Sequence, residues 1–194
     1  MSRKMRIVVM ALFAVVVMAF LVGCNDTPST DPAQESLEKA RSRVVETFSD
    51  EDLHTVQQAV HEMHETLNDL VGWGRIKTYV SQDDATWGPI VDPKEGVAVK
   101  LIEEVDKLLP LVEDETLKLD FQAFRKLIEI AAEKRLDVAL MYAHRMIHDL
   151  DYWVFNVDKS SDTSRDYWGA TATLHGKDGN PYYEWLEGRY YENH

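Results

Sequence analysis

The chain has 194 residues, with 21 Lys and Arg, 34 Asp and Glu, and one cysteine. This length suits a single domain with a sizeable hydrophobic core. The formal charge of −13 argues against a nucleic-acid partner, because such a chain repels phosphate. A lone cysteine excludes a disulfide framework within the chain and a metal site built from thiolates.

The first segment has the pattern of an export signal. Three basic residues, Arg3, Lys4 and Arg6, precede an apolar run from Ile7 to Leu21. A helix that crosses a bilayer needs about 20 residues, so this run is short for a membrane span. Its length and its basic flank are typical of a secretory signal.

The apolar run ends in Leu21-Val22-Gly23-Cys24. These four residues resemble the lipobox of bacterial lipoproteins. The resemblance implies that residues 1–23 are a signal peptide that is removed, and that the Cys24 thiol receives diacylglycerol. The mature chain would then be lipid-anchored at the extracytoplasmic face of the cell membrane. The alternative is an uncleaved signal anchor whose cysteine is incidental.

The mature chain would be more acidic than the precursor. Loss of the three basic residues leaves 18 Lys and Arg against 34 Asp and Glu, a formal charge of −16. Residues 24–31 are polar and contain a proline, which predicts a flexible tether after the lipidated N-terminus. Because anionic lipid head groups repel so acidic a domain, we expect it to stand off the membrane on its anchor.

Apolar residues at helical spacing predict a bundle domain over residues 32–157. Asp31-Pro32 is typical of an N-cap and first helical residue. The stretch from Ser49 to Asp52 predicts the start of a second helix. Its apolar seam steps by three and four and consists of Leu53, Val56, Val60, Met63, Leu67 and Leu70. Residues 72–91 show no sustained period and predict an ordered loop.

Further helices are expected downstream. Asp92-Pro93 predicts another capped start, and Pro110 predicts a kink or an end of that helix. Asp120 precedes the next apolar stripe, over Phe121 to Ala131, where another helix is expected. A turn is expected near residues 135–137, with one long bent helix as the alternative.

The C-terminal residues 158–194 differ in composition from the rest. They are rich in Ser, Asp and Gly, and the stretches 171–174 and 177–180 indicate a small hairpin. We therefore predict an all-α fold, an antiparallel bundle of four or five helices. A short irregular or hairpin C-terminal tail would pack on this bundle.

Five of the seven histidines lie on two of the predicted helices. On the earlier helix, His54, His61 and His64 fall in a polar stripe beside the apolar seam. On the later helix, His144, His148 and Asp151 follow one another at spacings of four and three. Side chains at such spacings share one helix face and can reach a common point.

Two interpretations of these stripes stay open. If the stripes face each other, the five residues could bind zinc, copper, nickel or iron, because neutral imidazole and carboxylate suit these metals and bundle cores host such sites. Alternatively, the histidines are half-buried and hydrogen-bonded to acids such as Asp149 and Asp151. Such pairing would raise the pKa values of the histidines and make the domain sensitive to pH.

The sequence predicts a protein that is not an enzyme, because it shows no activated nucleophile, phosphate loop or clear acid–base pair. The preferred function is a non-enzymatic binding domain that meets an envelope protein or wall polymer. The alternative is a transition-metal-binding lipoprotein. The Trp-Gly pairs at Trp73, Trp87 and Trp168 predict either an aromatic platform for sugars or plugs at the ends of the bundle.

Overall fold

The computed structural model of the chain describes residues 32–155 and 166–191. The chain divides into two compact units, Met1–Gln34 and Glu35–His194. The predicted signal peptide, Cys24 and the tether lie outside the described residues, as do residues 158–165 of the predicted tail. No strand occurs in the described ranges, and the regular structure there is helical throughout.

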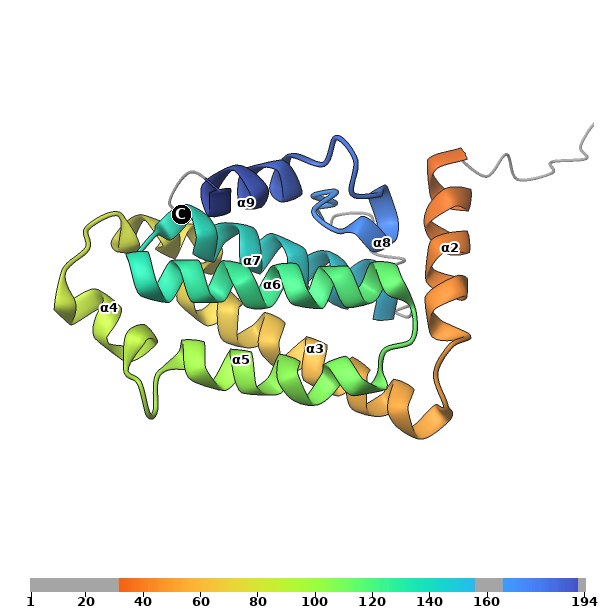
Figure 1. The fold of residues 1–194 in the computed structure, drawn as a ribbon, viewed down its shortest axis with the longest axis horizontal. Coiled ribbons are helices and arrows are strands. Elements are labelled where there is room, and N and C mark those ends of the chain that lie inside the picture. Colours follow the sequence, from red (N-terminus) through yellow and green to blue (C-terminus); the bar gives the residue numbers. More distant parts are fainter. Residues whose placement is uncertain (1–31, 156–165, 192–194) are drawn as a thin grey trace, which may run out of the picture. The chain divides into compact units, whose positions relative to one another are not determined.

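Four helices form the bundle: α3 (Asp50–Val71), α5 (Val97–Leu108), α6 (Glu115–Lys134) and α7 (Asp137–Asp149). Figure 1 shows α5, α6 and α7 side by side, with α3 packed against α7 and α5. Short connections join α5 to α6 and α6 to α7, so these neighbours run antiparallel. A further helix, α2 (Pro32–Val45), precedes them. The predicted all-α bundle is confirmed.

The predicted apolar seam lies in the core. On α3, Val56, Val60, Met63 and Leu67 are at most 3% exposed. Across the bundle they meet apolar side chains of α5, α6 and α7, including Leu101, Val105, Phe121, Phe124, Leu127, Leu140 and Ile147. Among the described helices, none combines the length and the apolar character that a membrane crossing requires.

Local signals placed some helix ends correctly. The Ser49 hydroxyl accepts a hydrogen bond from the backbone N–H of Asp52 at 3.2 Å, which caps α3 as predicted. The predicted turn after α6 is also confirmed, because Arg135 adopts a left-handed backbone (φ 47°, ψ 53°) and α7 begins two residues later. Pro110 lies in a short 3-10 turn, η2 (Leu109–Leu111), directly after α5 ends.

The predicted start of α5 was wrong. The helix begins at Val97, and its N-cap is Gly96. A side-chain carbon at Gly96 would lie 2.4 Å from the carbonyl oxygen of Asp92, so only glycine fits this position. The Asp92 carboxylate instead accepts the backbone N–H groups of Lys94 and Glu95, both at 2.8 Å, and closes the turn before the helix.

The start of α6 also differs from the prediction. Its N-cap is Asp114, whose carboxylate accepts backbone N–H groups of Thr116 and Leu117 at 2.9 and 3.0 Å. Asp120 therefore lies inside the helix, where its side chain is fully buried. An acid that resembles a cap in the sequence is here a buried acceptor for a distant part of the chain.

The loop predicted over residues 72–91 was wrong as well. It contains η1 (Gly72–Tyr79), a pair of 3-10 turns with a kink at Trp73, and the helix α4 (Asp84–Val91). The Asp83 carboxylate caps α4 by accepting the Thr86 N–H at 2.9 Å. Two short elements of this kind do not sustain a helical period long enough to be seen in the sequence.

The hairpin predicted in the tail was wrong. The described part of the tail contains α8 (Ala172–His175) and α9 (Pro181–Tyr191). The side chain of Asn180 accepts the Tyr182 N–H at 3.1 Å, so the residues that suggested a hairpin turn instead start a helix with proline at its first position. The Asp120 carboxylate binds the first N–H groups of α8 from across the fold.

Candidate functional site

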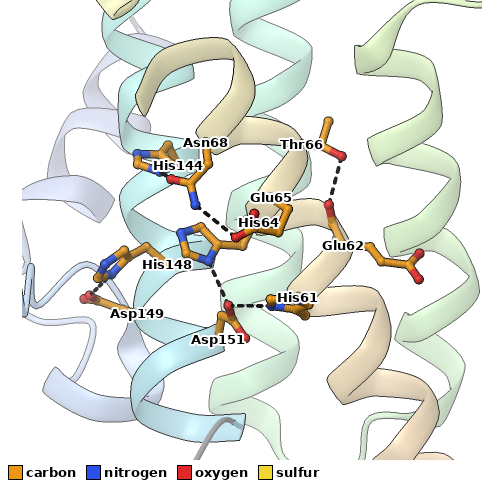
Figure 2. Close-up of polar contacts among 10 residues, drawn as sticks. All are labelled: His61, Glu62, His64, Glu65, Thr66, Asn68, His144, His148, Asp149 and Asp151. Atoms are coloured by element: carbon orange, nitrogen blue, oxygen red, sulfur yellow. Dashed lines mark hydrogen bonds and ion pairs between the residues drawn. The ribbon is translucent and has the colours of Figure 1, made fainter. Parts of the chain in front are cut away.

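The two histidine stripes face each other. Helix α3 packs against α7 and against η3 (Leu150–Phe155), the π-helical turn that continues α7. Figure 2 shows that this packing brings the five predicted ligand residues into one group at the α3–α7 contact. We call this group the histidine cluster; it consists of His61, His64, His144, His148 and Asp151.

Asp151 joins the two helices. Its Oδ2 lies 2.8 Å from Nδ1 of His64 and 3.1 Å from Nδ1 of His61. The side chains of Asp151 and His64 are 1% and 0% exposed, whereas that of His61 is 41% exposed. Single π-turns often occur at functional sites, and here the turn holds a buried carboxylate beside two imidazoles.

The other two histidines surround His64. The ring centroid of His64 lies 5.1 Å from that of His148 and 5.6 Å from that of His144, and the last two are 6.2 Å apart. Nε2 of His144 is bonded to Oδ1 of Asn68 on α3, at 2.8 Å. Tyr152 adds an edge-to-face contact to both His64 and His148, with centroids 5.0 and 4.7 Å away.

Asp149 connects the cluster to the chain beyond residue 165. It lies beside His148, with Nδ1 and Oδ1 3.4 Å apart, and it accepts the backbone N–H groups of Trp168 at 3.1 Å and Ala170 at 2.9 Å. The Arg145 guanidinium stacks on the Trp168 ring at 4.3 Å. The predicted pairing of histidines with Asp149 and Asp151 is therefore confirmed.

The expected rise in histidine pKa values does not hold for His144. Burial, together with the nearby His64, His148 and Arg145, lowers the pKa of His144 to about 4. Its hydrogen-bond partner is the neutral amide of Asn68 rather than a carboxylate, so nothing opposes these effects. His144 is therefore neutral at neutral pH.

One polar atom of the cluster has no partner. Nε2 of His64 is buried and forms no hydrogen bond within the described structure. His64, His144 and His148 each have one ring nitrogen beside a side-chain oxygen. The oxygen belongs to Asp151 for His64, to Asn68 for His144 and to Asp149 for His148. As the described side chains stand, no group of three or more His, Cys, Asp or Glu residues has the arrangement of a metal site.

A surface hollow lies beside part of the cluster. A hollow of about 230 Å³ is lined by His61 and Asp151 together with His54, Gln57, Gln58 and Phe155. His64 lies deeper and is closed off. The sequence interpretation did not include Tyr152 in this site, although Tyr152 follows His148 by four residues, a spacing that places both on one helix face.

The three Trp-Gly pairs do not build a common platform. Trp87 is completely buried and its indole N–H donates to the Ser81 carbonyl at 3.0 Å, so it plugs one end of the bundle. Trp168 is 36% exposed and lies under Arg145. Trp73 is 93% exposed. One of the three is thus a plug, and only Trp73 is fully available to an outside partner.

No protein-family model matches this sequence, and comparisons with curated proteins and with solved structures found no match.

Proposed function

We propose that the chain is a bacterial lipoprotein, anchored through Cys24 at the extracytoplasmic face of the cell membrane, whose bundle is a non-enzymatic binding domain. The observation that carries the anchor is the lipobox-like Leu21-Val22-Gly23-Cys24 after a short apolar run. The polar residues 24–31 between this cysteine and the start of α2 at Pro32 would form the short tether. Two acyl chains suffice for stable anchoring.

A binding role, rather than catalysis, is supported by two features of the described residues. The site richest in titratable groups is centred on His64, which is 0% exposed and out of reach of a substrate. The surface, by contrast, carries exposed apolar side chains at Trp73 and Val80. The proposed partner is an envelope protein or wall polymer near the membrane.

Lipidation of Cys24 tests the anchor directly. Expressed in a bacterial host, the full chain should incorporate a clickable palmitate analogue and fractionate with membranes. Cys24→Ala should abolish the label completely, because the acceptor thiol is lost, whereas the neighbouring Asn25→Ser should be labelled normally. Label on the Cys24→Ala chain would contradict the proposal. An unlabelled wild-type chain that keeps residues 1–23 would instead establish the uncleaved signal anchor.

The histidine cluster supports a second candidate function, transition-metal binding. Metal-ligating histidines usually donate their second ring N–H to an oxygen that fixes the ring. His64, His144 and His148 each have one nitrogen beside such an oxygen, and the remaining nitrogen of His64 is buried without a partner. In this arrangement the three histidines would be the ligands of zinc, copper, nickel or iron, and Asp151 would orient His64 rather than bind the metal. Small rotations of the imidazole rings would be needed.

Metal analysis of the purified mature chain, Cys24 to His194, tests this candidate. Saturation at about 100 times the Kd stabilises a protein by about 2.7 kcal/mol, so we expect Tm to rise by roughly 5–10 °C with the bound metal. The double variant His144→Ala, His148→Ala should lose this rise, while His54→Ala, an exposed histidine of the same stripe on α3, should keep it. Substoichiometric metal together with no change in Tm on adding zinc, copper or nickel would exclude the metal function.

A further inference from the structure

Trp73 occupies a position that neither the core nor the turn explains. Its side chain is 93% exposed, and its backbone is left-handed (φ 55°, ψ 30°) between Gly72 and Gly74. For a bulky residue this conformation is unfavourable, and glycine or asparagine would adopt it more easily. An indole held outward at such a cost indicates a contact outside the chain.

The surroundings of Trp73 differ from the rest of this acidic surface. Residues 70–82 contain no Asp or Glu, the longest such run after Cys24, and they include the exposed Arg75 and Lys77. Val80, at the end of η1, is 68% exposed. We call Trp73, Arg75, Lys77 and Val80 the η1 tip.

Two of the acids that border the tip form ion pairs at the surface, where the Asp69 and Asp84 side chains stay 86% and 87% exposed. Asp69 pairs with Arg75 at 3.8 Å, and Asp84 pairs with Arg135. Asp83 caps α4 by accepting the Thr86 N–H. The η1 tip itself carries two basic side chains and no acidic one, so an anionic layer would repel it less than the acidic residues around it.

We propose that the η1 tip seats in the lipid head-group layer of the bilayer to which the chain is anchored. This inference rests on the proposed tether at Cys24. Tryptophan favours the membrane–water interface, and arginine and lysine bind lipid phosphates there. One indole binds a bilayer weakly, but a tether makes the contact intramolecular and raises its effective concentration to the millimolar range or above.

This contact would orient the protein. The remaining acidic surface is repelled by anionic head groups, so docking of the η1 tip would direct the other faces of the bundle toward the envelope space. The expectation that the whole domain stands off the membrane would then hold for the acidic surface but not for the tip. A partner protein or wall polymer would find those other faces free.

The single cysteine allows a test that does not depend on lipidation in cells. The mature chain can be coupled through the Cys24 thiol to vesicles of phosphatidylcholine and phosphatidylglycerol that contain a maleimide lipid. Tryptophan emission is then compared between vesicles with and without lipids brominated near the glycerol backbone. We expect bromolipid to quench the wild-type chain, and we expect Trp73→Ala to lose most of that quenching. The matched control Trp168→Ala, another partly exposed tryptophan, should retain it.

Charge reversal supplies an independent variant that leaves every indole in place. Arg75→Glu with Lys77→Glu should reduce the quenching, and more strongly as the phosphatidylglycerol content rises. Equal quenching of wild type and Trp73→Ala, or none in either, would overturn the proposal while leaving the Cys24 anchor intact. A Trp73-dependent emission shift with soluble wall-polymer fragments, without quenching on vesicles, would overturn it in favour of a polymer partner.

Discussion

Replacing His64 by leucine should lower the free energy of unfolding by about 1–3 kcal/mol, the cost of removing a hydrogen-bond partner from a buried polar group. The Asp151 carboxylate is 1% exposed and has its shorter imidazole contact, 2.8 Å, with His64. Without that ring the carboxylate keeps His61 at 3.1 Å, whose own side chain is 41% exposed. Chemical denaturation followed by circular dichroism measures the loss.

Two further variants distinguish the loss of the His64–Asp151 interaction from the loss of a histidine side chain as such. His54→Leu alters an exposed histidine on the same helix and should change stability by no more than about 0.5 kcal/mol. His64→Leu combined with Asp151→Leu removes both buried polar groups, so the double variant should be clearly more stable than the sum of the two single losses predicts. A loss below about 1 kcal/mol for His64→Leu, or strict additivity in the double variant, would contradict a coupled pair at this site.

The part of the site that could be predicted is the part set by helical period. A spacing of three or four residues fixes which side chains share a face, so His61 with His64, and His144 with His148, were grouped correctly. That the two faces meet depends on how α3 and α7 pack, which no local pattern specifies. The structure shows that the two faces meet and which oxygen lies beside each histidine. For His144 that oxygen belongs to the neutral side chain of Asn68, which does not raise the low pKa of His144.

The errors have a common physical origin. Asp92 and Asp120 each precede an apolar stripe and so suggested helix starts, because a single sequence does not show which backbone N–H groups a carboxylate will bind. Asp92 meets its immediate neighbours and closes a turn. Asp120 meets the start of α8, 52 residues away, which is also why residues 171–174 form a helical turn and not a strand. Contacts at long sequence separation decide such cases.

Because of the same contact, we expect Asp120→Ala to cause the second large loss in the free energy of unfolding. The Asp120 carboxylate accepts three donors, the backbone N–H groups of Ala172 at 2.6 Å and Thr173 at 2.9 Å and the hydroxyl of Tyr183. All three residues are only 4% exposed, so each donor loses its acceptor without gaining water. At about 1–3 kcal/mol for each unsatisfied group, with partial relaxation, we expect a total loss of about 3–5 kcal/mol. Gln122→Ala, on an exposed position of the same helix, is the matched control.

Asp120→Asn should show a loss that depends on pH in a defined direction. Burial raises the pKa of Asp120 from 3.8 to about 6, and the hydrogen bonds that it accepts only partly offset this rise. Between these two values the folded chain holds a proton that the unfolded chain has released, so the contribution of Asp120 to stability is greatest below about pH 4 and falls as the pH rises to 6. The full change is up to about 3 kcal/mol.

Asparagine does not titrate, so the stability difference between wild type and Asp120→Asn should be largest near pH 4 and smallest above pH 6. His144 acts in the opposite sense, because its lowered pKa of about 4 means that stability is lost as the pH falls from 6.5 toward that value. Its effect is common to both proteins and cancels in their difference. A difference that is flat between pH 4 and 7, or that grows toward pH 7, would show that Asp120 is ionised throughout and holds α8 as a carboxylate.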